Sequence, residues 1–307
     1  RVRTFHFYEF EVIVRAMNQM KKALRNFEKY VPTTVVKSLM DSHRGIRIGV
    51  EPMYITIMFL DIADFTSITE KTDPDILVSV LEEFFTSMSE VISDNHGIID
   101  KYIGDCIMTL FNAPNTVPNH EEMAVKSALE MQRRTLALNE GWALKPHYPQ
   151  FAIRIGINTA ECLVGNVGSA NRVNSTALGD GVHIASNLEA LNKIFHTRII
   201  IGEKTFDAVQ SRYACSWLCR IKYKDKRLHT YTVFDEADVV TEDCMTSCLL
   251  HNMLREPFEE KNVPRMLQIC NEILTMAPSD IPAQELKKKL EESSAEMATA
   301  GDWDIPL

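Results

Sequence analysis

The strongest constraint on the fold is the order in which two kinds of hydrophobic periodicity alternate between residues 54 and 158. Short β-branched and aromatic runs predict buried strands, and apolar residues that recur every three or four positions predict amphipathic helices. The predicted order is strand 54–60, helix 74–95, strands 98–102 and 106–111, helix 121–139 and strand 151–158. Because only Ile103-Gly104-Asp105 separates the middle strands, we expect them to form a hairpin. The β-α-β-β-α-β order predicts an α+β fold, with a ferredoxin-like sheet and helices packed on it.

The chain divides by composition into a central domain and two flanking segments. The domain, predicted to span 45–238, continues beyond the first unit with a helix at 182–193 and strands at 198–202 and 231–234. Residues 239–307 shift toward Met, Lys and Glu and contain two predicted helices, 263–276 and 281–293, which resemble one helical hairpin of the tetratricopeptide type. A single hairpin of this kind cannot bury its own apolar face, so we expect it to dock on another surface.

Residues 1–44 open the chain with a heptad pattern. Its apolar positions are Phe10, Ile13, Met17, Met20, Leu24 and Phe27, with spacings of 3, 4, 3, 4 and 3 residues. This spacing is typical of a coiled-coil seam. Two interpretations stay open: a parallel dimer stalk that passes a signal downstream, or a helix packed on its own domain. Pro32 is expected to end this helix, and Thr33 or Thr34 to cap a short linker helix through Met40.

Two acidic residues lie at positions where they can meet. Asp61 closes the first predicted strand, and Asp105 lies in the hairpin turn. The first and middle strands of a β-α-β-β unit are neighbours in the sheet, so both carboxylates can reach one edge. Paired carboxylates suit two Mg²⁺ or Mn²⁺ ions, because a triphosphate supplies the remaining oxygen ligands. Just after Asp61, the backbone N–H groups of Phe65 and Thr66 can face phosphates where a loop opens into a helix.

Four motifs, in order along the chain, resemble those of class III adenylyl and guanylyl cyclase catalytic domains. They are Phe59-Leu60-Asp61-Ile62-Ala63-Asp64-Phe65-Thr66, Lys101-Tyr102-Ile103-Gly104-Asp105, Gly156-Ile157-Asn158 with Gly165-Asn166-Val167-Gly168-Ser169, and Asn174-Ser175-Thr176-Ala177-Leu178-Gly179-Asp180. The resemblance covers roughly residues 54–234. It implies an enzyme that converts a nucleoside triphosphate into a cyclic nucleotide and pyrophosphate at the interface of two such domains.

The resemblance also implies roles for individual residues. Asp61 and Asp105 would hold two Mg²⁺ or Mn²⁺ ions, with the Ile62 carbonyl assisting and Gly104 beside the substrate. Lys101 and Thr176 match the positions that recognise the purine. A Lys donor suits N1 of adenine and a hydroxyl can accept from its 6-amino group, so ATP is the expected substrate. A phosphate-binding lysine of the family matches either Lys222 or Lys224, and the sequence leaves this choice open.

The match fails at the helix that carries the transition-state residues. The family pattern there is N-x-x-x-R, and this chain has His183 and Asn187 instead. Loss of the arginine removes charge stabilisation on the transferring phosphate. The chain therefore resembles the first, metal-bearing half of a two-domain cyclase, and we expect a second, different cyclase domain to supply Asn and Arg. The alternatives are a catalytically silent regulatory subunit and a weak homodimeric adenylyl or guanylyl cyclase that uses His183.

Charge and signalling motifs bear on partners and location. The formal net charge of −9 repels the phosphate backbone, so no nucleic-acid partner is expected. The segment Ala16-Met17-Asn18-Gln19-Met20, with residues 27–32, resembles the output end of a HAMP-type signalling helix. That resemblance implies an upstream sensor, with this chain on the cytoplasmic side of a membrane. No run in the sequence reaches the roughly 18 apolar residues of a membrane span.

Overall fold

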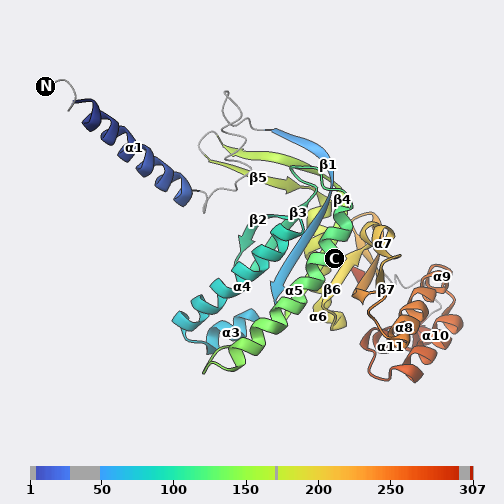
Figure 1. Cartoon of the computed structure of the whole chain (residues 1–307). Coiled ribbons are helices and arrows are strands. Elements are labelled where there is room, and N and C mark those ends of the chain that lie inside the picture. The colour runs from blue at the N-terminus through green and yellow to red at the C-terminus, as the bar shows by residue number, and fades with distance from the viewer. Residues whose placement is uncertain (1–4, 28–48, 170–171, 297–304, 307) are drawn as a thin grey trace. The chain divides into compact units, whose positions relative to one another are not determined.

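The computed structural model describes residues 5–27, 49–169, 172–296 and 305–306 (Figure 1). The chain divides into two compact units, Arg1–Val50 with Gly165–Thr176, and Glu51–Val164 with Ala177–Leu307. The linker helix that the sequence predicts at residues 33–40 lies outside the described residues, as does Pro32.

The described strands form one nine-stranded mixed sheet in the order β2-β3-β1-β4-β6-β8-β7-β9, with β5 paired to β4. The strands are β1 (Gly49–Ile62), β2 (Ile98–Ile103), β3 (Cys106–Phe111), β4 (Ile153–Ser169), β5 (Arg172–Leu178), β6 (Ile199–Gly202), β7 (Tyr213–Tyr223), β8 (Lys226–Glu236) and β9 (Ile305–Pro306). The order β2-β3-β1-β4, with β3 antiparallel to both β1 and β2, is the ferredoxin-like arrangement. The predicted fold class is confirmed.

The helices α3 (Phe65–Lys71), α4 (Pro74–Asp94), α5 (His120–Ala143), α6 (Asp180–Phe195) and α7 (Glu203–Val209) belong to the same domain. Alternate residues of β1 enter two separate cores, because side chains along a strand point to opposite faces. Met58 packs in the core that contains Phe84 of α4 and Val125 of α5. Ile57 packs in the core that contains Ala185 of α6. Helices α4 and α5 therefore cover one face of the sheet and α6 covers the other.

Strand β7 was not predicted from the sequence. Residues 213–219 are buried without a break, so this strand has no alternation of apolar and polar positions to reveal it. A strand covered on both faces is expected to have this pattern. The predicted strand 231–234 is the inner part of β8, which pairs with β7 through an antiparallel hairpin.

The N-terminal helix α1 spans Phe5–Phe27, as the heptad pattern predicts. Among its described side chains, Phe10, Ile13, Met17 and Met20 are all at least half exposed. The dimer-stalk interpretation stays a prediction.

The C-terminal segment contains the predicted helical hairpin, now α10 (Val263–Met276) and α11 (Ile281–Glu296), preceded by α8 (Glu242–Met253) and α9 (Arg255–Glu259). The apolar face of α10, including Met266 and Ile273, is buried in the same core as α4 and α5. Helix α8 contacts α10 of the hairpin and also the sheet, where Asn252 accepts a 2.8 Å hydrogen bond from the Trp217 backbone N–H and donates one to the Cys215 carbonyl. The hairpin thus docks on its own chain. None of the described helices is long and apolar enough to cross a bilayer.

A buried histidine also links the sheet to this segment. The Trp217 indole N–H donates to Nδ1 of His229 at 2.9 Å, and Nε2 of His229 lies 3.0 Å from a carboxylate oxygen of Glu259 in α9. Because an indole only donates, Nδ1 must accept, which fixes the neutral tautomer with its proton on Nε2. Burial is the largest effect on His229 and lowers its pKa, although Glu259 favours the charged form.

We predict that His229 makes the protein less stable in mild acid. The unfolded chain holds this histidine at its ordinary pKa, near 6.5, and so binds more protons than the folded chain as the pH falls below that value. The free energy of unfolding should therefore decrease below pH ~6.5. In His229→Gln, whose amide oxygen can still accept from Trp217, the slope should be shallower by up to ~1.4 kcal/mol per pH unit. Urea denaturation between pH 7 and 5 measures this; equal slopes in the two proteins would contradict it.

Candidate functional site

The pairing of β1 with β3 brings the two predicted metal ligands together. Leu60 of β1 lies opposite Ile107 of β3, so Asp61, the next residue on β1, reaches the edge where the β2–β3 turn lies. The two residues of that turn are Gly104 and Asp105, between the paired Ile103 and Cys106. Asp61 and Asp105 line the same pocket, close enough for the charge of Asp61 to act on the Asp105 carboxyl group. Carboxylates that are distant in the sequence thus share one edge of the sheet.

Gly104 gives the turn its geometry. Its φ of +66° lies in the left-handed region, and no atom stands within 4 Å of the position where a Cβ would be. The requirement for glycine is therefore conformational rather than a matter of space. The sequence predicts Gly104 beside the substrate. In the structure, Gly104 also sets the conformation of the turn that positions Asp105.

Asp105 lies in an environment that disfavours its negatively charged form. Burial and then the charge of Asp61 raise the pKa of Asp105 to about 6, although a backbone hydrogen bond from Ile62 acts in the opposite direction. Like charges that approach this closely oppose each other's ionisation. A divalent cation between the two carboxylates would relieve that repulsion, so the pair fits the predicted metal ions.

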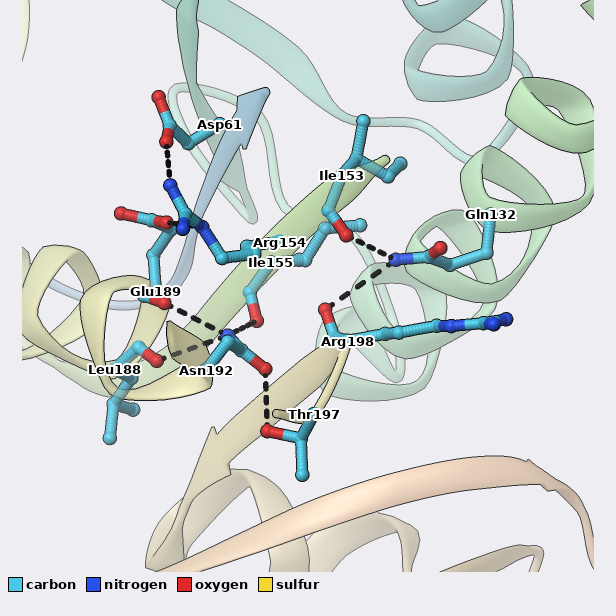
Figure 2. A network of polar contacts seen from close by, with 10 residues as sticks. All are labelled: Asp61, Gln132, Ile153, Arg154, Ile155, Leu188, Glu189, Asn192, Thr197 and Arg198. Carbon is cyan, nitrogen blue, oxygen red and sulfur yellow. Dashed lines mark hydrogen bonds and ion pairs between the residues drawn. The ribbon is translucent and has the colours of Figure 1, made fainter. Parts of the chain in front are cut away.

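Arg154 of β4 is a third member of the cluster, and the sequence analysis did not identify it. Its Nη2 donates to Oδ2 of Asp61 at 2.7 Å, and its Nε donates to Oε1 of Glu189 in α6 at 3.1 Å (Figure 2). Burial first, and then the charge of Asp61, raises the pKa of Glu189 to about 7, while Arg154 acts to lower it. One guanidinium thus bridges two carboxylates from different elements.

Close contact between β4 and α6 holds this bridge in place. A Cβ at Gly156 would collide with the backbone of Glu189 and Ala185 in α6, so only glycine lets the helix approach this closely. Nearby, the side-chain amide of Asn192 donates to the carbonyls of Ile155, at 3.0 Å, and of Glu189 in α6 (Figure 2). The strand and the helix are therefore fixed to each other where Arg154 meets Glu189.

An open pocket of about 720 Å³ contains the cluster. It is lined by Asp61, Ile62, Asp64, Phe65, Thr66, Ser67, Glu70, Asp105, Arg154 and Lys193. The predicted residues Phe65 and Thr66 are the first two of α3, so their backbone N–H groups belong to its first turn. Within the described part of the chain, no group of three or more His, Cys, Asp or Glu side chains is arranged to hold a metal by itself. Two carboxylates would need further oxygens, such as those of a triphosphate, to complete the coordination of an ion.

The other predicted residues lie outside this pocket. On the edge strand β2, Nζ of Lys101 lies 3.2 Å from a carboxylate oxygen of Asp100. Nζ of Lys224 lies 2.7 Å from Oδ1 of Asp180, at the start of α6, and Nζ of Lys226 lies 3.2 Å from Oδ2 of the same residue. Three further predicted residues are His183, exposed on α6, Lys222, exposed on β7, and Thr176, buried in β5 and part of the other compact unit.

Comparison with known proteins identifies the domain that carries this cluster. Residues 51–234 match the family model described as the adenylate and guanylate cyclase catalytic domain. The chain belongs to this cyclase family. Cyclase domains of this family are in general metal-dependent, bind a nucleotide substrate and function as dimers.

Curated relatives and solved structures agree with this assignment. The chain is 36% identical to adenylate cyclase 1 of Rhizobium meliloti over 64% of its own length and 29% of the relative's, and 30% identical to an adenylate cyclase of Anabaena cylindrica over 71% and 44%. The chain thus spans less than half the length of these two relatives. Among solved structures it resembles the adenylyl cyclase CyaB of P. aeruginosa (27% identity, TM-score 0.57, covering 63% of this chain and 100% of that one). It also resembles the guanylyl cyclase Cya2 (28% identity, TM-score 0.56, covering 63% and 98%).

Sequence reasoning missed Arg154, Glu189, Lys193 and Lys226. One signal for Arg154 was present, because it interrupts an otherwise apolar strand between Ile153 and Ile155. A charged residue in such a strand usually has a partner. Its partners are 93 and 35 residues away in the sequence, so only the folded chain reveals them.

We predict that Gly156→Ala destabilises the protein by about 2 kcal/mol, because the added methyl group pushes α6 away from β4. The matched control is Gly141→Ala on α5, where the added Cβ would meet nothing within 4 Å. Alanine is the better helix former, so this control should keep or slightly increase stability. Thermal and urea denaturation of both variants measure the difference. Equal stability of the two variants would show that the close contact of β4 with α6 does not need glycine.

Proposed function

We propose that this chain is a nucleotide cyclase subunit that converts ATP into 3′,5′-cyclic AMP and pyrophosphate at the interface with a second cyclase domain. The observation that carries the proposal is the approach of Asp61 to Asp105 in a pocket that also contains two cations, Arg154 and Lys193. Family membership gives this arrangement its interpretation.

Different groups of this chain have different proposed roles in the pocket. Asp61 and Asp105, with the Ile62 carbonyl, are the proposed ligands of two Mg²⁺ or Mn²⁺ ions. When bound, such ions supply activation of the ribose 3′-hydroxyl and neutralise charge on the leaving pyrophosphate. The backbone N–H groups of Phe65 and Thr66 face the phosphates, because they belong to the first turn of α3 and line the same pocket. Gly104 sets the turn that aims Asp105.

Recognition of the base is assigned to Lys101 and Thr176. An ammonium group donates to N1 of adenine, and a threonine hydroxyl accepts from the 6-amino group. Guanine carries a donor at N1 and an acceptor at O6, so it would disfavour this pair. Adenylate cyclases among the curated relatives support the choice of ATP, whereas the structural neighbours include both adenylyl and guanylyl cyclases.

A partner domain is proposed because the helix that should carry the transition-state residues lacks them. On α6, His183 and Asn187 stand where the family has Asn and Arg. We therefore propose a heterodimer in which this chain supplies the metal carboxylates, and the partner supplies Asn and Arg. One of the lysines Lys222 and Lys224 is the proposed phosphate contact on the β7–β8 hairpin, and Lys224 is the one paired with Asp180.

The flanking segments are assigned to signalling and assembly. We propose residues 1–44 as a signalling helix and linker, residues 45–238 as the cyclase domain, and residues 239–307 as a helical extension. An upstream sensor in a membrane, with this chain on its cytoplasmic side, is part of this proposal.

Binding of ATP should depend on metal ions and on both aspartates. We predict that calorimetry detects ATP binding only with Mg²⁺ or Mn²⁺, and that Asp61→Asn and Asp105→Asn each weaken it by about 10-fold or more, because each removes one charged ligand. Asp64→Asn is the matched control, since Asp64 lines the same pocket but is exposed. Unchanged ATP affinity in Asp61→Asn would remove the metal assignment.

The heterodimer is tested by complementation. We predict little cyclic AMP from the purified chain alone, since loss of the arginine should cost on the order of 10³-fold in rate. Production should rise on mixing with a class III cyclase domain that carries Asn and Arg but has alanine at its own metal positions. Parallel assays with ATP and GTP should favour ATP. Strong cyclic AMP production by the chain alone, unaffected by the partner, would refute the heterodimer.

A further inference from the structure

Asp61 has a counter-ion within its own chain. We propose that Arg154 competes with a divalent cation for Asp61, so that this chain binds the metal ion alone only weakly. The inference rests on the proposed function, because it takes Asp61 as a metal ligand. It adds a role for Arg154 and a dependence of metal binding on it.

The contact between these residues is short and partly shielded from water. Nη2 of Arg154 lies 2.7 Å from Oδ2 of Asp61, and the two side chains are 18% and 22% exposed. A charge-assisted hydrogen bond of this length is among the stronger polar contacts in proteins. Partial burial also reduces screening by salt and water. Arg154 and Asp61 therefore form a stable, partly buried ion pair rather than a transient surface contact.

Glu189 keeps the guanidinium in place from the other side. Nε of Arg154 lies 3.1 Å from Oε1 of Glu189, whose side chain is 14% exposed. Glu189 is fixed in turn, because Asn192 ties the same turn of α6 to β4 and Gly156 allows their close approach (Figure 2). Arg154 is thus held at two points by elements that pack tightly on each other.

The charges around Arg154 explain how it opposes binding of a metal ion. Asp61 and Glu189 both contact the Arg154 guanidinium, and Asp105 adds a third carboxyl group in the same pocket as Asp61. Arginine stays protonated at any physiological pH, so Arg154 cannot release Asp61 by losing its proton. A cation that takes Oδ2 of Asp61 must displace Nη2 of Arg154 and meet its positive charge. A metal ion that arrives with a triphosphate brings compensating negative charge, so this obstacle applies chiefly to the metal ion alone.

The test measures Mn²⁺ binding without nucleotide, by the loss of the free-ion signal in electron paramagnetic resonance. Arg154→Gln alone would leave Glu189 half-buried without its partner, so the main variant is the double substitution Arg154→Gln with Glu189→Gln. At pH 8, above the pKa of Glu189, this pair of changes leaves the net charge of the site nearly unaltered. Lys193→Gln is the control, because Lys193 lines the same pocket and, within the described part of the chain, forms no ion pair with Asp61.

Direct competition by Arg154 and a general effect of positive charge in the pocket predict opposite orders of Mn²⁺ affinity for the two variants. If Arg154 competes directly for Asp61, the double variant should bind Mn²⁺ about 10-fold more tightly than the original protein, the scale of one lost charged hydrogen bond. Lys193→Gln should change the affinity by less. If only the overall field matters, Lys193→Gln should tighten binding and the double variant should not, which would overturn the inference. Denaturation curves for each variant establish that it is folded.

Failure of the inference can be told apart from failure of the proposed function. Equal Mn²⁺ affinity in the original protein and the double variant would overturn the role of Arg154 and leave Asp61 as a metal ligand. No Mn²⁺ binding to the original protein, even with ATP present, would overturn the metal site itself and the inference with it.

Discussion

The antiparallel pairing of β1 with β3 is the constraint on which the candidate site depends. It sets Leu60 opposite Ile107, and this register carries Asp61 to the edge where the hairpin turn presents Asp105. A shift of one residue would turn Asp61 to the opposite face of the sheet, because side-chain direction alternates along a strand. The same alternation sends Ile57 and Met58 into separate cores, so burial on both faces protects the register. The same strand register therefore determines both the core packing and the position of the carboxylates.

Bringing carboxylates together has an electrostatic cost, and the structure offsets part of it. Burial first, and then the charge of Asp61, raises the pKa values of Asp105 and Glu189, and the bridge from Arg154 offsets some of this cost for Glu189. Gly156 contributes indirectly, since it lets α6 bring Glu189 to the bridge. The site therefore combines unfavourable charge with tightly packed support, an arrangement common where function requires perturbed groups.

The sequence predicted the parts of the fold that local patterns determine. Alternating periodicities predicted the order of β1, α4, β2, β3, α5 and β4, and the short turn around Gly104 predicted the hairpin that places Asp105. Strand β7 escaped prediction because residues 213–219 are buried on both faces and so lack alternation. The contacts of Arg154 with Asp61 and Glu189 escaped for another reason, since they depend on long-range register and on the approach of a helix to a strand. The ion pair of Lys224 with Asp180 is also long-range, joining a hairpin to the start of a helix 44 residues away.

The most direct test of the account is to locate the metal by anomalous X-ray scattering. Crystals would be grown with Mn²⁺ and 3′-deoxy-ATP, which lacks the hydroxyl needed for cyclisation. We expect a Mn²⁺ peak at ordinary metal–oxygen distance, about 2.1 Å, from carboxylate oxygens of both Asp61 and Asp105. A peak bound to only one of them, or to neither, would contradict the central claim that this edge of the sheet forms a metal–nucleotide site.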